Sequence, residues 1–218
     1  MRTAVYVDGF NLYYWMKRTA YRWIDLKALA LSAITKPGKE HQIVAVKYFT
    51  AHVSDTDDDP SKAMRQDTYF KALTAFIPEL TIYKGEFRRN QDDAPRVTRG
   101  GGVGDLVRVW VTEEKGSDVN LAVELVNDAW LGLYDAAVVI SNDSDLERAV
   151  LTAKKKGRTI INLVRGDADF MSLKRVSSYA KMLTMEDLQN SLMPRQIPDT
   201  KISIPHSWEL MERRANIR

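Results

Sequence analysis

The chain of 218 residues contains no cysteine. Disulfide bonds, thiolate nucleophiles and cysteine-ligated zinc or iron–sulfur sites are therefore all excluded. Histidine is also scarce, because only His41, His52 and His206 occur and none of them has the close spacing of a zinc site. A bound metal is thus expected to take oxygen ligands, which favours a hard cation such as Mg²⁺ or Mn²⁺.

No apolar run in the sequence is long enough to span a bilayer, so no membrane contact is expected. The chain also runs from Met1 straight into a short apolar segment, without the features of a secretion signal, and a cytoplasmic protein is expected. Hydrophobic residues make up 44% of the chain, which is enough to bury one proper core.

The charge balance gives only weak information about partners. The formal net charge is +3, which is too small to establish nucleic-acid binding. Basic residues do cluster at Arg88-Arg89, in the run from Lys154 to Arg158, at Lys174-Arg175 and at Arg213-Arg214. Each cluster taken alone is more often a solvated face than a binding site.

Short apolar runs alternate with segments of helical periodicity along most of the chain. Expected strands cover residues 4–7, 43–51, 80–87, 107–111, 136–140 and 160–164. Expected helices cover residues 12–18, 26–34 and 61–76, with others from about 117 and up to 154. This alternation predicts an α/β fold with a mostly parallel central sheet flanked by helices on both faces.

Two segments lack this periodicity. Residues 88–104 are polar, basic and glycine-rich, which predicts a mobile loop. The glycines at 100–104 follow no tight strand and lack dinucleotide-binding spacing, so a Rossmann site is rejected. After a domain over residues 1–187, the prolines beyond Leu188 predict an extended C-terminal tail over 188–218, with a short helix at 208–214.

Four aspartates lie where strand ends and helix starts should meet. Asp8 ends the first apolar run, and Asp143 and Asp145 directly follow the run at 136–140. The carboxyl ends of parallel strands share one edge of a sheet, so these acids are expected to converge. Asp118, at a helix start facing the same edge, would complete a four-carboxylate metal site, because a divalent cation relieves the mutual repulsion.

Helix capping is the alternative reading for three of these acids, Asp118, Asp143 and Asp145, since short acceptors commonly satisfy free N–H groups at helix starts. Asp8 is harder to explain in this way, because Asn or Ser would cap equally well. The spacing Ser144-x-x-Glu147 also fits a capping box, which favours a structural role for Glu147 over that of a fifth ligand.

Other polar residues are candidates for substrate contacts. Asn11 is expected to face either a phosphate or Asp8, with an exposed polar position as the alternative. Lys115 is a candidate for the scissile phosphate and ranks below the acids. Three arginines and the basic run at 154–158 are candidates for contacts with the backbone of a nucleic acid. The alternative for each of them is an ordinary solvent-exposed position. These arginines are Arg96, Arg99 and Arg108.

Three blocks of the sequence together resemble a known family. They read Tyr-Val-Asp-Gly-Phe-Asn-Leu at 6–12, Glu-Lys-Gly-Ser-Asp-Val-Asn-Leu-Ala at 114–122 and Ile-Ser-Asn-Asp-Ser-Asp-Leu at 140–146. In type and order they resemble the NYN domain, a PIN-like nuclease family that includes bacterial proteins, over roughly residues 3 to 165. Asn142 and Ser117 depart from the family pattern, which more often has Gly and an apolar residue there, but neither departure removes a carboxylate.

The resemblance implies a PIN-like three-layer α/β fold, a Mg²⁺ or Mn²⁺ site built from Asp8, Asp118, Asp143 and Asp145, and RNA as substrate. The expected function is that of a metal-dependent ribonuclease that hydrolyses phosphodiester bonds, with Asp8 and Asp143 as the principal direct ligands. A non-catalytic RNA-binding or scaffold module is the alternative. Single-stranded DNA as a second partner and a homodimer are left open.

A phosphatase of the haloacid-dehalogenase type also begins with an apolar strand that ends in Asp. That class needs a second acid two positions later, and here the position holds Phe10. The nucleophile would have no general acid beside it, so this reading is rejected.

Overall fold

The computed structural model describes residues 1–34, 40–165 and 171–215. Its centre is a seven-stranded sheet with the strand order β4-β3-β2-β1-β5-β6-β7. In chain order the strands are β1 (Arg2–Asp8), β2 (Gln42–Ala51), β3 (Leu80–Val97), β4 (Val103–Lys115), β5 (Ala136–Ile140), β6 (Thr159–Arg165) and β7 (Tyr179–Leu183). Every neighbouring pair is parallel except β3 and β4, which are antiparallel.

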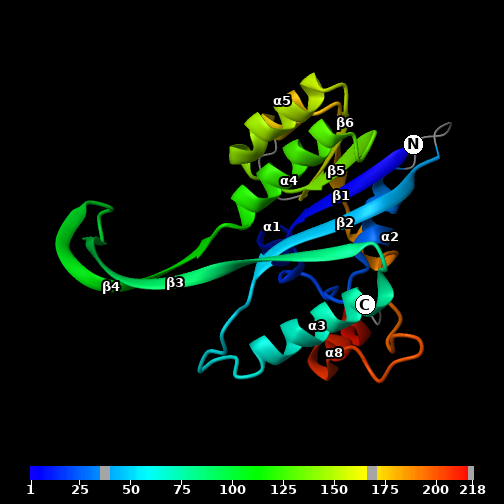
Figure 1. Cartoon of the computed structure of the whole chain (residues 1–218). Helices are drawn as coiled ribbons and strands as arrows, with labels where there is room; N and C mark the ends of the chain where they lie inside the picture. The colour runs from blue at the N-terminus through cyan, green and yellow to red at the C-terminus, as the bar shows by residue number, and fades with distance from the viewer. Residues whose placement is uncertain (35–39, 166–170, 216–218) are drawn as a thin grey trace.

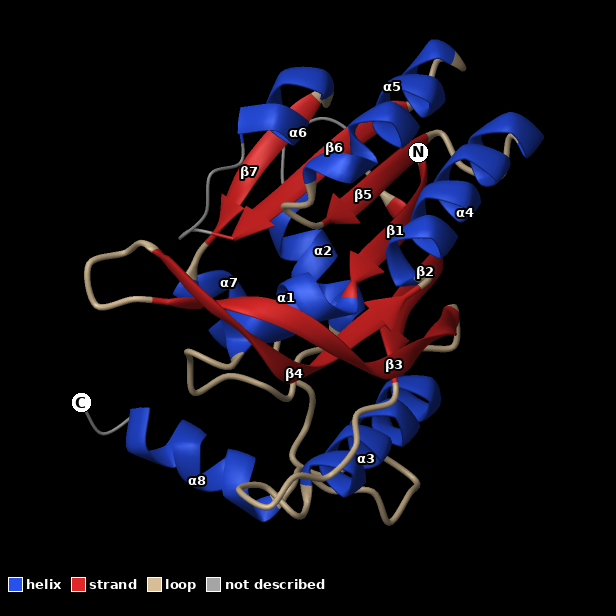
Figure 2. Ribbon diagram, turned by 90° about the vertical axis from the view of Figure 1, so that its left-hand side faces the viewer, coloured by secondary structure: helices blue, strands red, loops and turns tan. Residues whose placement is uncertain are grey.

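Helices cover both faces of this sheet (Figures 1 and 2). In the described part of the chain they are α1 (Gly9–Met16), α2 (Leu26–Ile34), α3 (Lys62–Phe76), α4 (Ser117–Leu131), α5 (Glu147–Lys155), α6 (Met171–Val176), α7 (Met185–Gln189) and α8 (His206–Ala215), with a short 3₁₀ turn η1 (Ser144–Leu146) before α5. None of the described helices is both long and apolar enough to cross a bilayer. The expected α/β fold with a mostly parallel sheet is confirmed.

Two hydrophobic cores sandwich the sheet because its central strands are apolar on both faces. In β1, Val5 and Val7 pack into the core under α1, α2 and α3, whereas Ala4 and Tyr6 pack into the core under α4 and α5. Figure 1 shows α4 and α5 on one side of the sheet and α3 and α8 on the other. Continuous apolar runs are typical of such doubly covered strands.

The register of the central strands places two strand ends side by side. Val7 in β1 lies opposite Ile140 in β5, so the next residues, Asp8 and Ser141, leave the sheet as neighbours. The position after Asp8 requires glycine, because a β-carbon on Gly9 would lie 2.6 Å from the carbonyl oxygen of Phe49. The close approach of α1 to β2 therefore depends on the absence of a side chain there.

A buried polar network fixes α4 to the sheet. The hydroxyl of Tyr6 donates to Asp128 at 2.5 Å, and both residues are almost fully buried. Lys47 of β2 forms ion pairs with Asp128 at 2.6 Å and with Glu124 at 2.5 Å. Removing one partner from such a network leaves a buried charge uncompensated, so the network specifies where α4 sits.

The expectation of a mobile loop over residues 88–104 is wrong. These residues belong to a long antiparallel ribbon, here called the β-arm (residues 86–115), in which Glu86 pairs with Lys115 and Val97 with Val103. The β-arm extends well beyond the body of the molecule (Figures 1 and 2), by roughly 40 Å at the usual rise of an antiparallel strand. Most of residues 88–104 are exposed, so their sequence lacks the apolar alternation by which a half-buried strand is identified, whereas the strand expected at 107–111 is found in β4.

The segment expected as an extended tail packs against the body. It has little regular structure before α8, in keeping with its prolines, and α8 covers the short helix expected at 208–214. Several of its apolar side chains nevertheless belong to the core under α2 and α3, namely Leu188, Met193, Ile197, Ile204 and Trp208. The ring of Trp208 lies 6.4 Å from that of Trp23 and 6.0 Å from that of Tyr69.

This packing predicts that Trp208→Ala lowers the free energy of unfolding by about 3 kcal/mol, since it removes a large aromatic side chain from the core. Trp130→Ala is the matched control, because Trp130 lies 63% exposed on α4, and it should cost less than about 1 kcal/mol. Urea denaturation followed by far-ultraviolet circular dichroism measures both. Equal losses for the two variants would contradict a structural role for the C-terminal segment.

Candidate metal centre

Asp8 is held in place by hydrogen bonds to both of its carboxylate oxygens. Its Oδ1 accepts from the backbone N–H of Asn11 at 2.9 Å, and its Oδ2 accepts from the hydroxyl of Ser141 at 2.8 Å. Asp8 thus caps α1 from the end of β1 and is only 5% exposed. Burial raises the pKa of Asp8, and the nearby charge of Asp143 adds to the shift, although the two hydrogen bonds oppose it.

Ser141 connects Asp8 to Asp143. The hydroxyl that donates to Asp8 accepts the backbone N–H of Asp143 at 3.0 Å, so both hydrogen-bonding roles of this buried oxygen are filled. Asp143 in turn accepts from the backbone N–H of Asp145 at 3.0 Å and caps the turn η1. Asn11 supports the same loop, because its side-chain oxygen accepts from the N–H of Asn142 at 3.3 Å.

Asp118 reaches the site from the start of α4, and a different acid caps that helix. Glu114 accepts from the backbone N–H of Ser117 at 3.1 Å and from its hydroxyl at 2.6 Å, while Asp118 makes no capping bond. Glu114 lies against Gly85, where a β-carbon would overlap its carboxylate. The capping alternative therefore fails for Asp118, whereas Asp8 and Asp143 both cap and face the site.

Three of the four predicted acids form what is here called the acidic cluster: Asp8, Asp118 and Asp143. One carboxylate oxygen from each lies within 4.8 Å of the others. Partial desolvation raises the pKa of Asp118 to about 6, and the charges of Asp8 and Asp143 add to this shift, followed by those of Glu114 and Asp145. The carboxylates therefore repel one another strongly.

The donor set fits a divalent hard cation. All three groups of the acidic cluster offer carboxylate oxygens, which are the ligands that Mg²⁺ and Mn²⁺ prefer. The cluster lies at the carboxyl edge of the parallel strands, where ligands bind in open α/β sheets. A cation there would offset the repulsion from Asp8 and Asp143 that adds to the effect of burial on the pKa of Asp118.

The remaining predicted residues lie outside this cluster. Asp145 is exposed, and its carboxylate oxygens do not belong to the acidic cluster. Its negative charge still acts on Asp118. Lys115 is exposed at the base of the β-arm and pairs with Glu113 at 2.7 Å. Arg108 pairs with Asp93 across the β-arm at 3.1 Å. The two other predicted arginines lie further out, in β3 and in the tip turn: Arg96 and Arg99.

The capping box expected at Ser144 and Glu147 does not form. Asp143 caps η1, and no side chain caps α5, which begins at Glu147. Glu147 instead pairs with Arg175 at 3.1 Å and so contributes to the contact with α6. Its structural role is retained through a different partner.

Sequence reasoning did not assign roles to Ser141 and Glu114. Both lay within the motif blocks, and a signal was present for each: Ser141 is the hydroxyl residue between a strand end and a cluster acid, and Glu114 is an acid just ahead of a helix start. Each role depends on two particular hydrogen bonds, which the pattern of residue types does not specify.

The fold and the acidic cluster define an α/β protein with a carboxylate site suited to a divalent cation. The model of the NYN domain family matches residues 2–183, and the chain belongs to this nuclease-like family. The resemblance carried by the three sequence blocks is thereby confirmed.

Two similar proteins add different information. A protein of Pseudomonas putida (strain DSM 28022 / S16), 30% identical over 95% of this chain and 75% of its own length, is named 6-hydroxy-3-succinoylpyridine 3-monooxygenase HspA. A crystal structure of a protein of unknown function from Vibrio parahaemolyticus RIMD 2210633 matches with a TM-score of 0.55 at 14% identity, covering 88% of this chain and 96% of that one. The second similarity shows the fold alone.

The raised pKa of Asp118 predicts a pH-dependent stability in the absence of metal. An acid whose folded-state pKa lies above its ordinary value stabilises the fold while protonated, and this stabilisation is lost as the pH rises through about 6. In chelator, the Tm should therefore fall as the pH rises from about 4 to about 6, and Asp118→Asn should remove much of that fall. Differential scanning fluorimetry measures the profile.

The matched control is Asp105→Asn, which changes an exposed acid on the β-arm and should keep the wild-type profile. Addition of Mn²⁺ near neutral pH should raise the Tm of the wild type more than that of Asp118→Asn. Identical profiles for wild type and Asp118→Asn would argue against a repulsive carboxylate cluster.

Proposed function

We propose that the protein is a metal-dependent ribonuclease with a PIN-like fold, which hydrolyses phosphodiester bonds at the acidic cluster. The observation that supports this most directly is the convergence of Asp8, Asp118 and Asp143 within 4.8 Å, in a chain of the NYN domain family. The three acids come from two strand ends and one helix start that are far apart in sequence. Helix capping does not account for this convergence, because Asp118 caps nothing.

In this proposal Asp8, Asp118 and Asp143 hold Mg²⁺ or Mn²⁺, and Asp145 completes the outer part of the site. The cation supplies a Lewis acid that favours ionisation of the attacking water and neutralises charge on the phosphate. The rigid residue is Asp8, since both of its oxygens are hydrogen-bonded. Ser141 and Asn11 act as positioning residues that fix the loop carrying Asp143.

The substrate is proposed to approach from the side of the β-arm. Lys115 lies close in sequence to Asp118 and would exchange its ion pair with Glu113 for a phosphate. Arg96, Arg99 and Arg108 are proposed to contact the backbone of RNA further out. Single-stranded DNA is the other polyanion to test, and the proposed location is the cytoplasm.

A second candidate function follows from the name of the Pseudomonas relative, which describes a monooxygenase acting on a substituted pyridine. The observation in this chain that favours a small aromatic ligand is a cavity with aromatic walls beside Gly9 and Phe10. Conversion of such a ligand would be a separate activity from cleavage of RNA.

The nuclease proposal predicts that Asp143→Asn lowers the rate of RNA cleavage by about 100-fold or more, because a ligand charge is lost from the site. Purified protein would be incubated with end-labelled single-stranded RNA and Mn²⁺, with and without chelator, and the products resolved on a denaturing gel. Binding of the RNA, measured by fluorescence anisotropy, should change much less.

Asp57→Asn is the control, because Asp57 is an exposed acid in the turn before α3 and its substitution should leave cleavage at the wild-type rate. Cleavage that survives chelator or Asp143→Asn would come from a contaminant or a different mechanism. Binding of RNA without cleavage of any RNA or DNA substrate would favour the non-catalytic module.

A further inference from the structure

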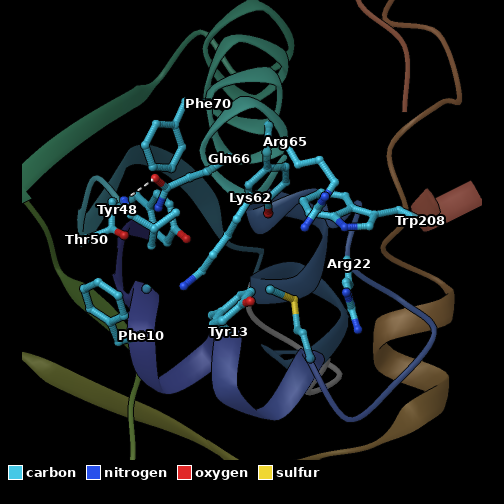
Figure 3. Close-up of a pocket in the computed structure, with 14 residues that line it drawn as sticks. Phe10, Tyr13, Arg22, Tyr48, Thr50, Lys62, Arg65, Gln66, Phe70 and Trp208 are labelled. Carbon is cyan, nitrogen blue, oxygen red and sulfur yellow. Dashed lines mark hydrogen bonds between the residues drawn. The ribbon is translucent and has the colours of Figure 1, made fainter. Parts of the chain in front are cut away.

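A cavity of about 60 Å³ borders the first turn of α1, next to the acidic cluster (Figure 3). It lies between α1, β2 and α3 and is closed at one side by Trp208 of α8. None of the described residues that line it is an acid, and three are cations. We propose that this cavity binds a small aromatic acid, meaning a carboxylate carried on one planar ring, independently of any cleavage at the acidic cluster.

Six of the fourteen described residues that line the cavity are aromatic. Phe10 and Tyr13 come from α1, Tyr48 from β2, and Phe70 from α3. The rings of Tyr48 and Phe70 meet edge to face with centroids 6.1 Å apart. Aromatic walls in stacked and edge-to-face arrangements favour a planar ring as the ligand.

The cations give the cavity an unbalanced positive charge. Arg65 forms an ion pair with Asp59, which neutralises it. Lys62 extends from α3 across the cavity toward α1, and it takes part in none of the ion pairs found among the described residues. A lysine pointing into apolar surroundings is stabilised when an anion binds beside it.

Arg22 adds a second unbalanced charge. One of its terminal nitrogens donates to the carbonyl of Lys17 at 3.0 Å. Its Nε is buried and has no hydrogen-bond partner within the described structure. A buried donor without a partner is costly, and the positive charge of Arg22 at the edge of the cavity adds to the attraction for an anion.

The size and the remaining polar groups favour an acid over a nucleotide. A volume of about 60 Å³ is too small for a base together with its ribose and phosphate. Both the oxygen and the nitrogen of the Gln66 amide already have a partner, since the oxygen accepts from the N–H of Val53 and the nitrogen donates to the carbonyl of Ala51, both at 2.9 Å. The hydroxyl of Tyr69 donates to the carbonyl of Ile24 at 2.8 Å. Few groups are therefore left to recognise the edge of a base, whereas the cations remain.

The test is isothermal titration calorimetry of the full chain with benzoate and nicotinate as probes, and with benzamide and nicotinamide as neutral matches. We expect the acids to bind about 10-fold or more tightly than the amides, because a charge-assisted contact is lost in the amide. Lys62→Gln should weaken binding of the acids by about 10-fold or more, toward the amide level. Lys71→Gln, an exposed lysine on the same helix, should bind as the wild type does.

Three outcomes would overturn the proposal. They are failure of both acids to bind the wild type at about 10 mM, equal binding of acids and amides, and an unchanged affinity in Lys62→Gln whose Tm matches the wild type. Uridine and cytidine monophosphate are titrated alongside, and tighter binding of either than of benzoate, lost in Lys62→Gln, would assign the cavity to a nucleotide instead. Because no RNA is present, the result is independent of the cleavage assay.

Discussion

Three carboxylates brought within 4.8 Å repel one another, and the local structure around them is organised to withstand that repulsion. Asp8 is fixed by two hydrogen bonds at the end of the central strand, and Ser141 passes the same support to the N–H of Asp143. Glu114 caps α4 in place of Asp118. The acids therefore face one another because neighbouring polar groups hold them in these orientations.

These orientations are kept only if β1, α1 and α4, which support the acids, are themselves firmly fixed. β1 lies at the centre of the sheet, paired on both sides, and α1 approaches β2 closely enough to require Gly9. The helix that carries Asp118 is fixed to the same strands by the buried network of Tyr6, Lys47 and Asp128. Asp8 and Asp118 are therefore carried by rigid elements, and the loop that carries Asp143 is held by hydrogen bonds to Ser141 and Asn11.

Much of the fold could be predicted from the sequence because the central strands are covered on both faces and read as continuous apolar runs. The convergence of Asp8 with Asp143 followed from the shared carboxyl edge of parallel strands. Strands were expected at 80–87 and 107–111 and are found in β3 and β4, but residues 88–104 could not be identified in this way, because most of them are exposed and carry no apolar alternation. The burial of Trp208 was also hidden, because it depends on packing against residues such as Trp23, far away in sequence. The separation of Asp145 from the acidic cluster depends on a single turn, η1, whose geometry residue types alone do not fix.

The β-arm joins the body at a single base, so its length does not affect the position of the acidic cluster. Its first ladder pair, Glu86 with Lys115, lies directly between Gly85 and Gly116, so both strands of the ribbon leave and return at one place. Residues gained or lost in opposite pairs beyond that base would change how far the ribbon reaches while Glu114 and Asp118 keep their positions. The reach of the ribbon can therefore change in this architecture without moving the residues of the acidic cluster.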